Sequence, residues 1–314
     1  MDMSNERSYT IEEVSQLLKV SKLTVYDLVK KEELPVFRVG RQMRVDAKDL
    51  DDYIKKHKTN QLTRQSPTTG LQQNETEASH SQSIVISGQD MVLDILATQI
   101  ENHSSYKTLR SFTGSLNSLF SLYNGQCDIV SLHMFDGDSG QYNLPYVKKV
   151  LVSDSYLLMN LVLRKAGMYV QKGNPLHITS WKDLKRKSIK MINREKGSGA
   201  RTLLDEQLRI HHISPKDIEG YERVEMNHLS VASSVASGQA DVGVGIEKVA
   251  KIVGVDFIPL ITERYDLVML KNPQNDSLIK VVTSILTSAS FKQKIHSLGD
   301  YDVSEMGSII YETY

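Results

Sequence analysis

The sequence contains a single cysteine, Cys127, among 314 residues. One cysteine cannot form a disulfide within the chain or a cage of several thiolates around a metal ion, so we expect a reducing compartment. Cys127 is best explained as a small buried side chain. No stretch approaches the ~20 consecutive apolar residues of a membrane span, and the opening MDMSNERSYT lacks the apolar core of a signal peptide. We therefore expect a cytoplasmic protein.

The sequence also lacks an excess of either charge, because 38 Lys and Arg residues balance 38 Asp and Glu residues. Any contact with nucleic acid must then come from a local basic patch. Recognised enzyme motifs are missing too: the nine histidines form no H-E-x-x-H pattern, and no G-x-S-x-G elbow occurs. His133, Asp136 and Asp138 lack a metal-ligand spacing. We expect no catalytic site, metal or cofactor, and an enzyme with a DNA-binding anchor remains an alternative.

The chain is longer than one typical domain, and its composition changes along its length. Residues 1–58 alternate short apolar and basic patterns, and residues 84–314 carry repeated apolar runs. Between them, residues 59–83 are rich in Thr, Gln, Ser and Asn, with almost no aliphatic side chains. This composition predicts a flexible linker between a small N-terminal domain and a larger one.

The N-terminal segment carries signals for three helices and a hairpin. Thr10 and Glu13 have the spacing of a capping box ahead of an amphipathic helix, and Ser21 can cap a second helix close behind it. Two helices so close together are typical of a helix-turn-helix. Residues 34–45 alternate apolar and polar positions around a glycine, which predicts a hairpin, and Asp46 can cap a third helix.

Residues 9–54 resemble the excisionase-type winged helix-turn-helix, which is related to the mercury-resistance regulators, and the likeness includes the hairpin motif L-P-x-x-R-V-G-R. The resemblance implies that the second helix enters the major groove of double-stranded DNA and that the hairpin, called the wing, contacts the DNA backbone. Because so small a domain has little surface with which to bind tightly alone, we expect a homodimer that binds paired half-sites. The residues implicated are Ser21, Lys22, Thr24, Tyr26, Arg38, Arg41 and Arg44.

From residue 84 onward, buried strands alternate with helices, which indicates an α/β domain with parallel strands. The strands are expected at residues 84–86, 127–132, 188–193 and 240–245. Three of the strand-to-helix junctions place glycine or hydroxyl residues at a helix N-terminus, where backbone N–H groups favour an anion. The Gly197-Ser198-Gly199 junction matches neither a phosphate loop nor a dinucleotide fingerprint.

The same order of blocks resembles the type II periplasmic-binding-protein fold, in the form that is joined to a helix-turn-helix in molybdate-type regulators. The motifs that carry the resemblance are Ser87-Gly88-Gln89-Asp90, Ser131-Leu132-His133, the segment 193–201 and the segment 237–243. The resemblance implies two lobes that close on a ligand, with crossing strands at 157–170 and 257–270. We expect lobe 1 to span about 84–162 and 258–314, and lobe 2 about 163–257.

The expected ligand is a small oxyanion, molybdate or tungstate, because hydroxyl and N–H donors can satisfy its oxygens without a full counter-charge. Arg201 either binds the anion directly or pairs with Asp205 or Glu206 on its own helix. Asp90 either caps a helix or holds a hydrogen-bond donor in place. If Asp90 and Arg201 both face the cleft, the ligand is instead an amino acid or small carboxylate. The candidate ligand-binding residues are Ser87, Gly88, Asp90, Gly114, Ser115, His133, Gly197, Ser198, Gly199, Arg201 and Asp241.

Together these patterns predict a ligand-responsive transcriptional regulator. Its fold class is α/β, with a small N-terminal winged helix-turn-helix and a two-lobed periplasmic-binding-protein-like domain.

Overall fold

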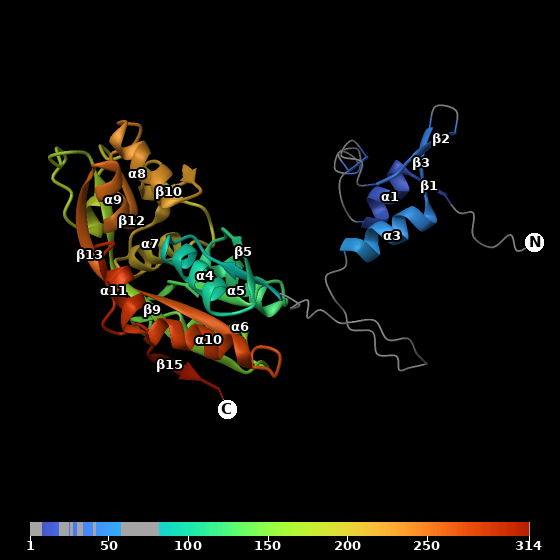
Figure 1. The fold of residues 1–314 in the computed structure, drawn as a ribbon. Helices are drawn as coiled ribbons and strands as arrows, with labels where there is room; N and C mark the ends of the chain where they lie inside the picture. Colours follow the sequence, from blue (N-terminus) through green and yellow to red (C-terminus); the bar gives the residue numbers. More distant parts are fainter. Residues whose placement is uncertain are drawn as a thin grey trace, which may run out of the picture. The chain divides into compact units, whose positions relative to one another are not determined.

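The structure is a computed structural model that describes residues 8–18, 25, 28–29, 34–39, 42–57 and 82–313. It divides into two compact units, residues 1–76 and 77–314, which are described separately below (Figure 1). Nearly all of the predicted linker, residues 59–83, lies outside the described residues.

The first unit contains a three-stranded antiparallel sheet in the order β1-β3-β2. Its elements are β1 (Ser8–Thr10), α1 (Ile11–Leu18), β2 (Phe37–Val39), β3 (Gln42–Asp46) and α3 (Ala47–His57). The predicted capping box is confirmed: the Glu13 N–H donates to the Thr10 hydroxyl at 3.2 Å, and the Thr10 N–H donates to the Glu13 carboxylate at 2.8 Å. The predicted hairpin forms as β2 and β3, whereas strand β1 was not predicted.

The third helix starts as predicted, because the Asp46 carboxylate accepts the Lys48 N–H at 2.9 Å. Val25 lies in a helical position and is fully buried, and Leu28 and Val29 pack against the same core, while the rest of the predicted second helix lies outside the described residues. The core consists of Ile11, Val14, Val25, Leu34, Val45 and Leu50.

The second unit is built on one mixed sheet in the order β11-β10-β12-β9-β13-β6-β4-β5. We call the side with β6, β4 and β5 the first half and the side with β12, β10 and β11 the second half. Strands pair in parallel within each half, as predicted. The bounds are β4 (Ser83–Ser87), β5 (Lys107–Ser111), β6 (Ile129–Leu132), β10 (Met191–Arg194), β11 (Val224–Glu225) and β12 (Val242–Ile246).

Two long strands join the halves: β9 (Tyr156–Val170) and β13 (Asp256–Leu270). They pair antiparallel along their whole length and match the predicted crossing segments. Nearly every residue of β9 is buried, which explains its largely apolar sequence. The centre of the sheet is therefore antiparallel and lies between the parallel strands of the two halves. The C-terminal strands β14 (Tyr301–Asp302) and β15 (Ile309–Glu312) add to β9.

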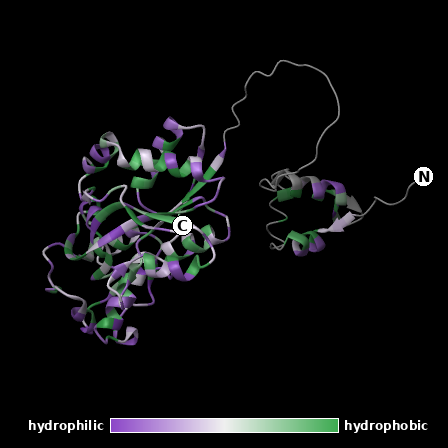
Figure 2. Cartoon of the chain, turned by 90° about the horizontal axis from the view of Figure 1, so that it is seen from below, coloured by the Kyte–Doolittle hydropathy of each residue, from purple (hydrophilic) through white to green (hydrophobic). Residues whose placement is uncertain are grey.

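Helices pack on both faces of this sheet, and each half has its own apolar core (Figures 1 and 2). The first half carries α4 (Val92–His103), α5 (Ser115–Tyr123), α6 (Leu144–Val150), α10 (Asp276–Thr287) and α11 (Ala289–His296). The second half carries α7 (Gly199–Ile210), α8 (His228–Ala236) and α9 (Glu247–Val253). Cys127 and Trp181 are buried, as expected. Within the described residues, no helix is long and apolar enough to cross a membrane.

Candidate ligand-binding site

The N-termini of α5 and α7 meet between the two halves of the second unit. The Leu116 N–H, in the first turn of α5, donates to the Gly197 carbonyl at 3.0 Å. Gly114 makes this approach possible, since a Cβ at that position would lie 2.8 Å from the same carbonyl oxygen. Two of the predicted strand-to-helix junctions therefore converge, one from each half.

Gly88 and His133 complete this meeting point. Gly88 has φ +144°, and a Cβ there would lie 1.9 Å from the Ser131 hydroxyl, so glycine is required on both counts. The His133 ring covers Gly199 so closely that a Cβ on Gly199 would lie 2.6 Å from ring atoms. His133, from the first half, thus touches the start of α7 in the second half.

The predicted hydroxyl donors are already engaged within the protein. Ser87 hydrogen-bonds the Thr113 and Ser118 hydroxyls at 2.7 and 2.8 Å. The Ser115 hydroxyl accepts the His133 N–H at 3.3 Å. The Ser198 hydroxyl accepts the Arg201 N–H at 3.2 Å and donates to the Glu195 carbonyl at 2.9 Å. The donors that remain for an anion are chiefly the backbone N–H groups in the first turns of α5 and α7.

Arg201 and Asp241 do not join this group. Arg201 is buried and pairs with Asp205 one turn along α7 at 3.1 Å, which is the helix-partner alternative left open by the sequence. Its guanidinium also lies 4.1 Å from the centre of the Tyr221 ring. Asp241 accepts the Lys190 N–H at 2.8 Å just before β12, at the opposite end of that strand from Ile246 in the cleft.

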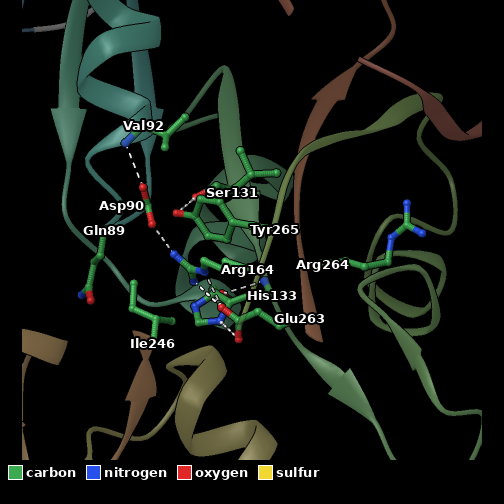
Figure 3. A network of polar contacts seen from close by, with 12 residues as sticks. Gln89, Asp90, Val92, Ser131, His133, Arg164, Ile246, Glu263, Arg264 and Tyr265 are labelled. Carbon is green, nitrogen blue, oxygen red and sulfur yellow. Dashed lines mark hydrogen bonds and ion pairs between the residues drawn. The ribbon is translucent and has the colours of Figure 1, made fainter. Parts of the chain in front are cut away.

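A buried ion network beside the helix N-termini connects the first half to the crossing strands β9 and β13 (Figure 3). Arg164 on β9 lies between Asp90 and Glu263, and its Nε donates to Glu263 Oε1 at 2.5 Å. Glu263 also contacts His133 Nδ1 at 3.2 Å. The Arg164 guanidinium lies 4.2 Å from the centre of the Tyr265 ring.

Asp90 combines the two roles considered for it. Its Oδ1 accepts the Val92 N–H at 2.8 Å at the start of α4, and its other oxygen pairs with Arg164. The Tyr301 hydroxyl donates to the same carboxylate at 3.0 Å. Asp90 is therefore a helix cap and also the holder of a buried guanidinium.

The charges of the network shift the ionisation of its members. Burial raises the pKa of Glu263, but Arg164 and His133 outweigh this effect and lower the pKa to about 2. Burial, with Arg194, Arg164 and His133 nearby, lowers the pKa of His228 well below its ordinary value. His228 is consequently neutral at pH 7.

Five residues of the cleft were not predicted as site residues: Arg164, Glu263, Tyr265, Tyr301 and His228. A signal was present for the first two, since each charge interrupts a long apolar strand and buried charges are normally paired. Arg194 was quoted within a motif without a role. It is buried, donates to Gln89 Oε1 at 2.7 Å, and pairs with Glu195 at 2.8 Å, so it links the two halves.

The cleft has a narrow part and a wide part. The narrow part, which we call the niche, has room of about 10 Å³, close to the minimum for one water. The wide part is a cavity of about 360 Å³. Gln89, His133 and Tyr265 line both parts. The niche is otherwise lined by Gly88, Thr113, Gly114, Ser115, Ser131, Arg194 and Ser198, and the cavity by Asp90, Met91, Arg164, Asn227, His228, Leu229, Ile246, Lys248, Val249, Ile252 and Tyr301.

For the predicted DNA contacts, the structure describes one side chain. Arg44 lies on β3, and its guanidinium donates to the Ser8 hydroxyl at 3.2 Å. Arg38 lies on β2, where the backbone alone is described. Ser21, Lys22, Thr24, Tyr26 and Arg41 lie outside the described residues. Their roles stay predictions. Among the described residues, no group of His, Cys, Asp and Glu could hold a metal ion.

Two α/β halves with a cleft between them, crossed by paired strands, define the class of two-lobed solute-binding domains. A family model described as the PBP superfamily domain matches residues 97–287, more than half of the chain, and a helix-turn-helix domain model matches residues 8–58. The chain belongs to the PBP superfamily, with a helix-turn-helix DNA-binding domain at its N-terminus.

The full length of the chain has a relative in Bacillus subtilis, the uncharacterized protein YvgK, which is 52% identical over 99% of this chain and 100% of the relative. A tungstate ABC transporter structure from Geobacter sulfurreducens has a TM-score of 0.52 at 14% identity, covering 68% of this chain and 98% of its own. A Clostridium perfringens protein with bound phosphate has a TM-score of 0.52 at 15% identity, covering 70% and 98%. At these identities the two structures show the fold alone.

Proposed function

We propose that this protein is a DNA-binding transcriptional regulator whose second unit binds a small anion in the cleft between its halves. A DNA-binding domain and a solute-binding domain in one chain support this function. The ligand acts by favouring one arrangement of the second unit, which changes the placement or the pairing of the DNA-binding domains in a homodimer.

One observation carries the ligand class. The N-termini of α5 and α7 face each other across the niche, and the buried guanidinium of Arg194 lies beside them. Two helix N-termini present N–H groups and positive dipole ends, which favour an oxyanion. Molybdate and tungstate are the first candidates. Because the niche has room of only about 10 Å³, the oxyanion enters when the halves move apart.

Isothermal titration calorimetry with molybdate, tungstate and sulfate in parallel tests the ligand. We expect tight binding of the first two ions. Gly114→Ala should reduce that affinity at least tenfold, because its Cβ would occupy the niche itself, 3.0 Å from the backbone nitrogen of Ser198, where the ion must lie. Ser121→Ala, further along the same helix, is the control and should leave the affinity unchanged. If Gly114→Ala binds as the parent does, the niche is not the site.

The DNA-binding half is tested by salt dependence. Arg41→Ala should weaken binding of operator DNA and should lower the slope of log K against log salt by about 0.9 for one lost phosphate contact. If the ligand changes the affinity of the protein for DNA by some factor, then DNA must change the affinity of the protein for the ligand by the same factor. A monomeric protein that ignores DNA with and without ligand would contradict the proposal.

A second candidate ligand is an amino acid or small carboxylate. The cavity of about 360 Å³ favours it, because that volume lies within the range of small-molecule sites. The arrangement does not support recognition by Asp90 and Arg201, since Asp90 holds Arg164 and Arg201 pairs with Asp205. The matching families bind DNA and solutes, and nothing in the described cleft favours the enzyme alternative over them.

A further inference from the structure

The wide part of the cleft has apolar walls and a polar inner end. Met91 projects from the first half, and Leu229 and Ile252 project from the second half. These three side chains are 40%, 52% and 55% exposed, respectively, although each lines the cavity. The inner end is the part next to the niche: Gln89 lines both the cavity and the niche, and the His228 ring lies 6.3 Å from the ring of His133, which also lines both.

An inorganic oxyanion leaves these walls uncovered. A tetrahedral ion at the helix N-termini would contact backbone N–H groups, yet the large apolar side chains lie on the other side of Gln89 and His133. Large apolar side chains exposed on both sides of one cavity remain hydrated until an apolar group displaces the water. The walls therefore match the body of an organic ligand.

The ions around the cavity leave no guanidinium free for a ligand. Arg164 lies between two carboxylates, Asp90 and Glu263, and Arg194 pairs with Glu195. Lys248, which also lines the cavity, binds the Leu298 carbonyl and lies 3.9 Å from Asp300. Because the two guanidinium groups face three carboxylates, negative charge on a ligand must be met by polar contacts, and a ligand with one charge suits the cavity better than a ligand with two.

His228 supplies a polar contact that the protein does not use. Its Nδ1 is buried and has no hydrogen-bond partner among the described residues. A buried nitrogen without a partner is costly, and a carboxylate oxygen would satisfy it in the tautomer that carries the Nδ1 proton. Gln89 also lines the cavity, and its Nε2 makes only long hydrogen bonds, at 3.4 and 3.5 Å, to the Phe112 and Met226 carbonyls, which a carboxylate can replace.

We propose that the cavity binds an organic monocarboxylate, with its carboxylate beside Gln89 and His228 and its apolar body against Met91, Leu229 and Ile252. This inference rests on the proposed ligand-sensing function and names the class of ligand. The apolar walls then contribute directly to the affinity for the ligand, because the ligand covers their apolar surface.

The test is a calorimetric titration of the full chain with straight-chain carboxylates from acetate to octanoate, and with molybdate as the reference. Affinity should rise roughly fourfold per added methylene until the walls are covered. Ile252→Asp should remove this dependence on chain length. Ile309→Asp is the matched control, because Ile309 is 54% exposed on β15 and lines neither part of the cleft, so the dependence should persist.

Three results would overturn the inference: no binding of any carboxylate, an affinity that is constant along the series, or equal effects of the two variants. Tight molybdate binding with a constant carboxylate series would overturn it and leave the regulator proposal standing. Carboxylate binding that rises with chain length but never changes DNA affinity would support the inference and overturn the regulator proposal instead.

Discussion

The two units treat their charged residues in opposite ways. In the first unit, Glu13 lies at the surface and Arg44 is partly buried, and both make local or single hydrogen bonds around a small core. In the second unit, the buried Arg164 binds the buried carboxylates of Asp90, in the first half, and Glu263, on the neighbouring crossing strand. A cation that is still accessible can meet a polyanion such as DNA, whereas the buried ions of the second unit are matched within the protein and fix the first half against the crossing strands.

The largest test of this contrast removes the central cation of the network. Arg164→Met leaves Asp90 and Glu263 buried without a counter-ion, and should destabilise the second unit by about 3–5 kcal/mol. The single tryptophan, Trp181, lies in the second unit, so urea unfolding followed by its fluorescence reports on that unit alone.

Arg209→Met is the control for this experiment. Arg209 pairs with Glu206 and Asp138, but its side chain is 51% exposed, so little change is expected. Equal losses in the two variants would show that the buried network contributes no more than a surface pair.

Local signals made the first unit predictable. The capping box of Thr10 and Glu13 spans four residues, and the Asp46 cap spans three, so the sequence contains both partners side by side. The crossing strands of the second unit were also predictable, because β9 and β13 are long enough to be recognised by their apolar composition and their place in the resemblance.

The site itself depends on distances that no local pattern contains. Arg164 meets Glu263 because the β9–β13 register places them opposite each other, although they are 99 residues apart. The choice between a cleft clamp and a helix partner for Arg201 also depended on tertiary structure. Its sequence spacing to Asp205 allowed the pair, and the position of Tyr221 over the guanidinium completes it.

A pH titration of stability sharpens the contrast within the second unit. Glu263 has a pKa of about 2 in the folded protein, below its ordinary value of 4.5, so its contribution to stability is present above pH 4.5 and is lost as the pH falls toward 2. For Asp266, burial outweighs hydrogen bonds from Asn143 and Asn160 and raises the pKa from 3.8 to about 6. Its contribution is present below 3.8 and is lost as pH rises through 6.

The two groups together predict a stability maximum near pH 4 and a decline of roughly 2–3 kcal/mol from Asp266 between pH 4 and 7. Urea unfolding followed by Trp181 at intervals of half a pH unit measures this decline. Asp266→Asn should flatten the slope over that range, whatever its effect on overall stability. A slope that Asp266→Asn leaves intact would assign the pH dependence to another group.

The smallest expected effect tests whether the first unit is held by local contacts. Thr10→Ala removes the hydroxyl that accepts the Glu13 N–H, and should cost the first unit about 1 kcal/mol. Hydrogen exchange in the full chain should show about fivefold lower protection in α1, which corresponds to that free energy, with no change in Trp181 unfolding. Thr98→Ala is the matched control, because the Thr98 hydroxyl donates to the Asp94 carbonyl at 2.9 Å on an exposed face of α4 and caps no helix. If Thr10→Ala also shifted Trp181 unfolding, the two units would be energetically coupled in the absence of ligand, and stability could not be assigned to each unit separately.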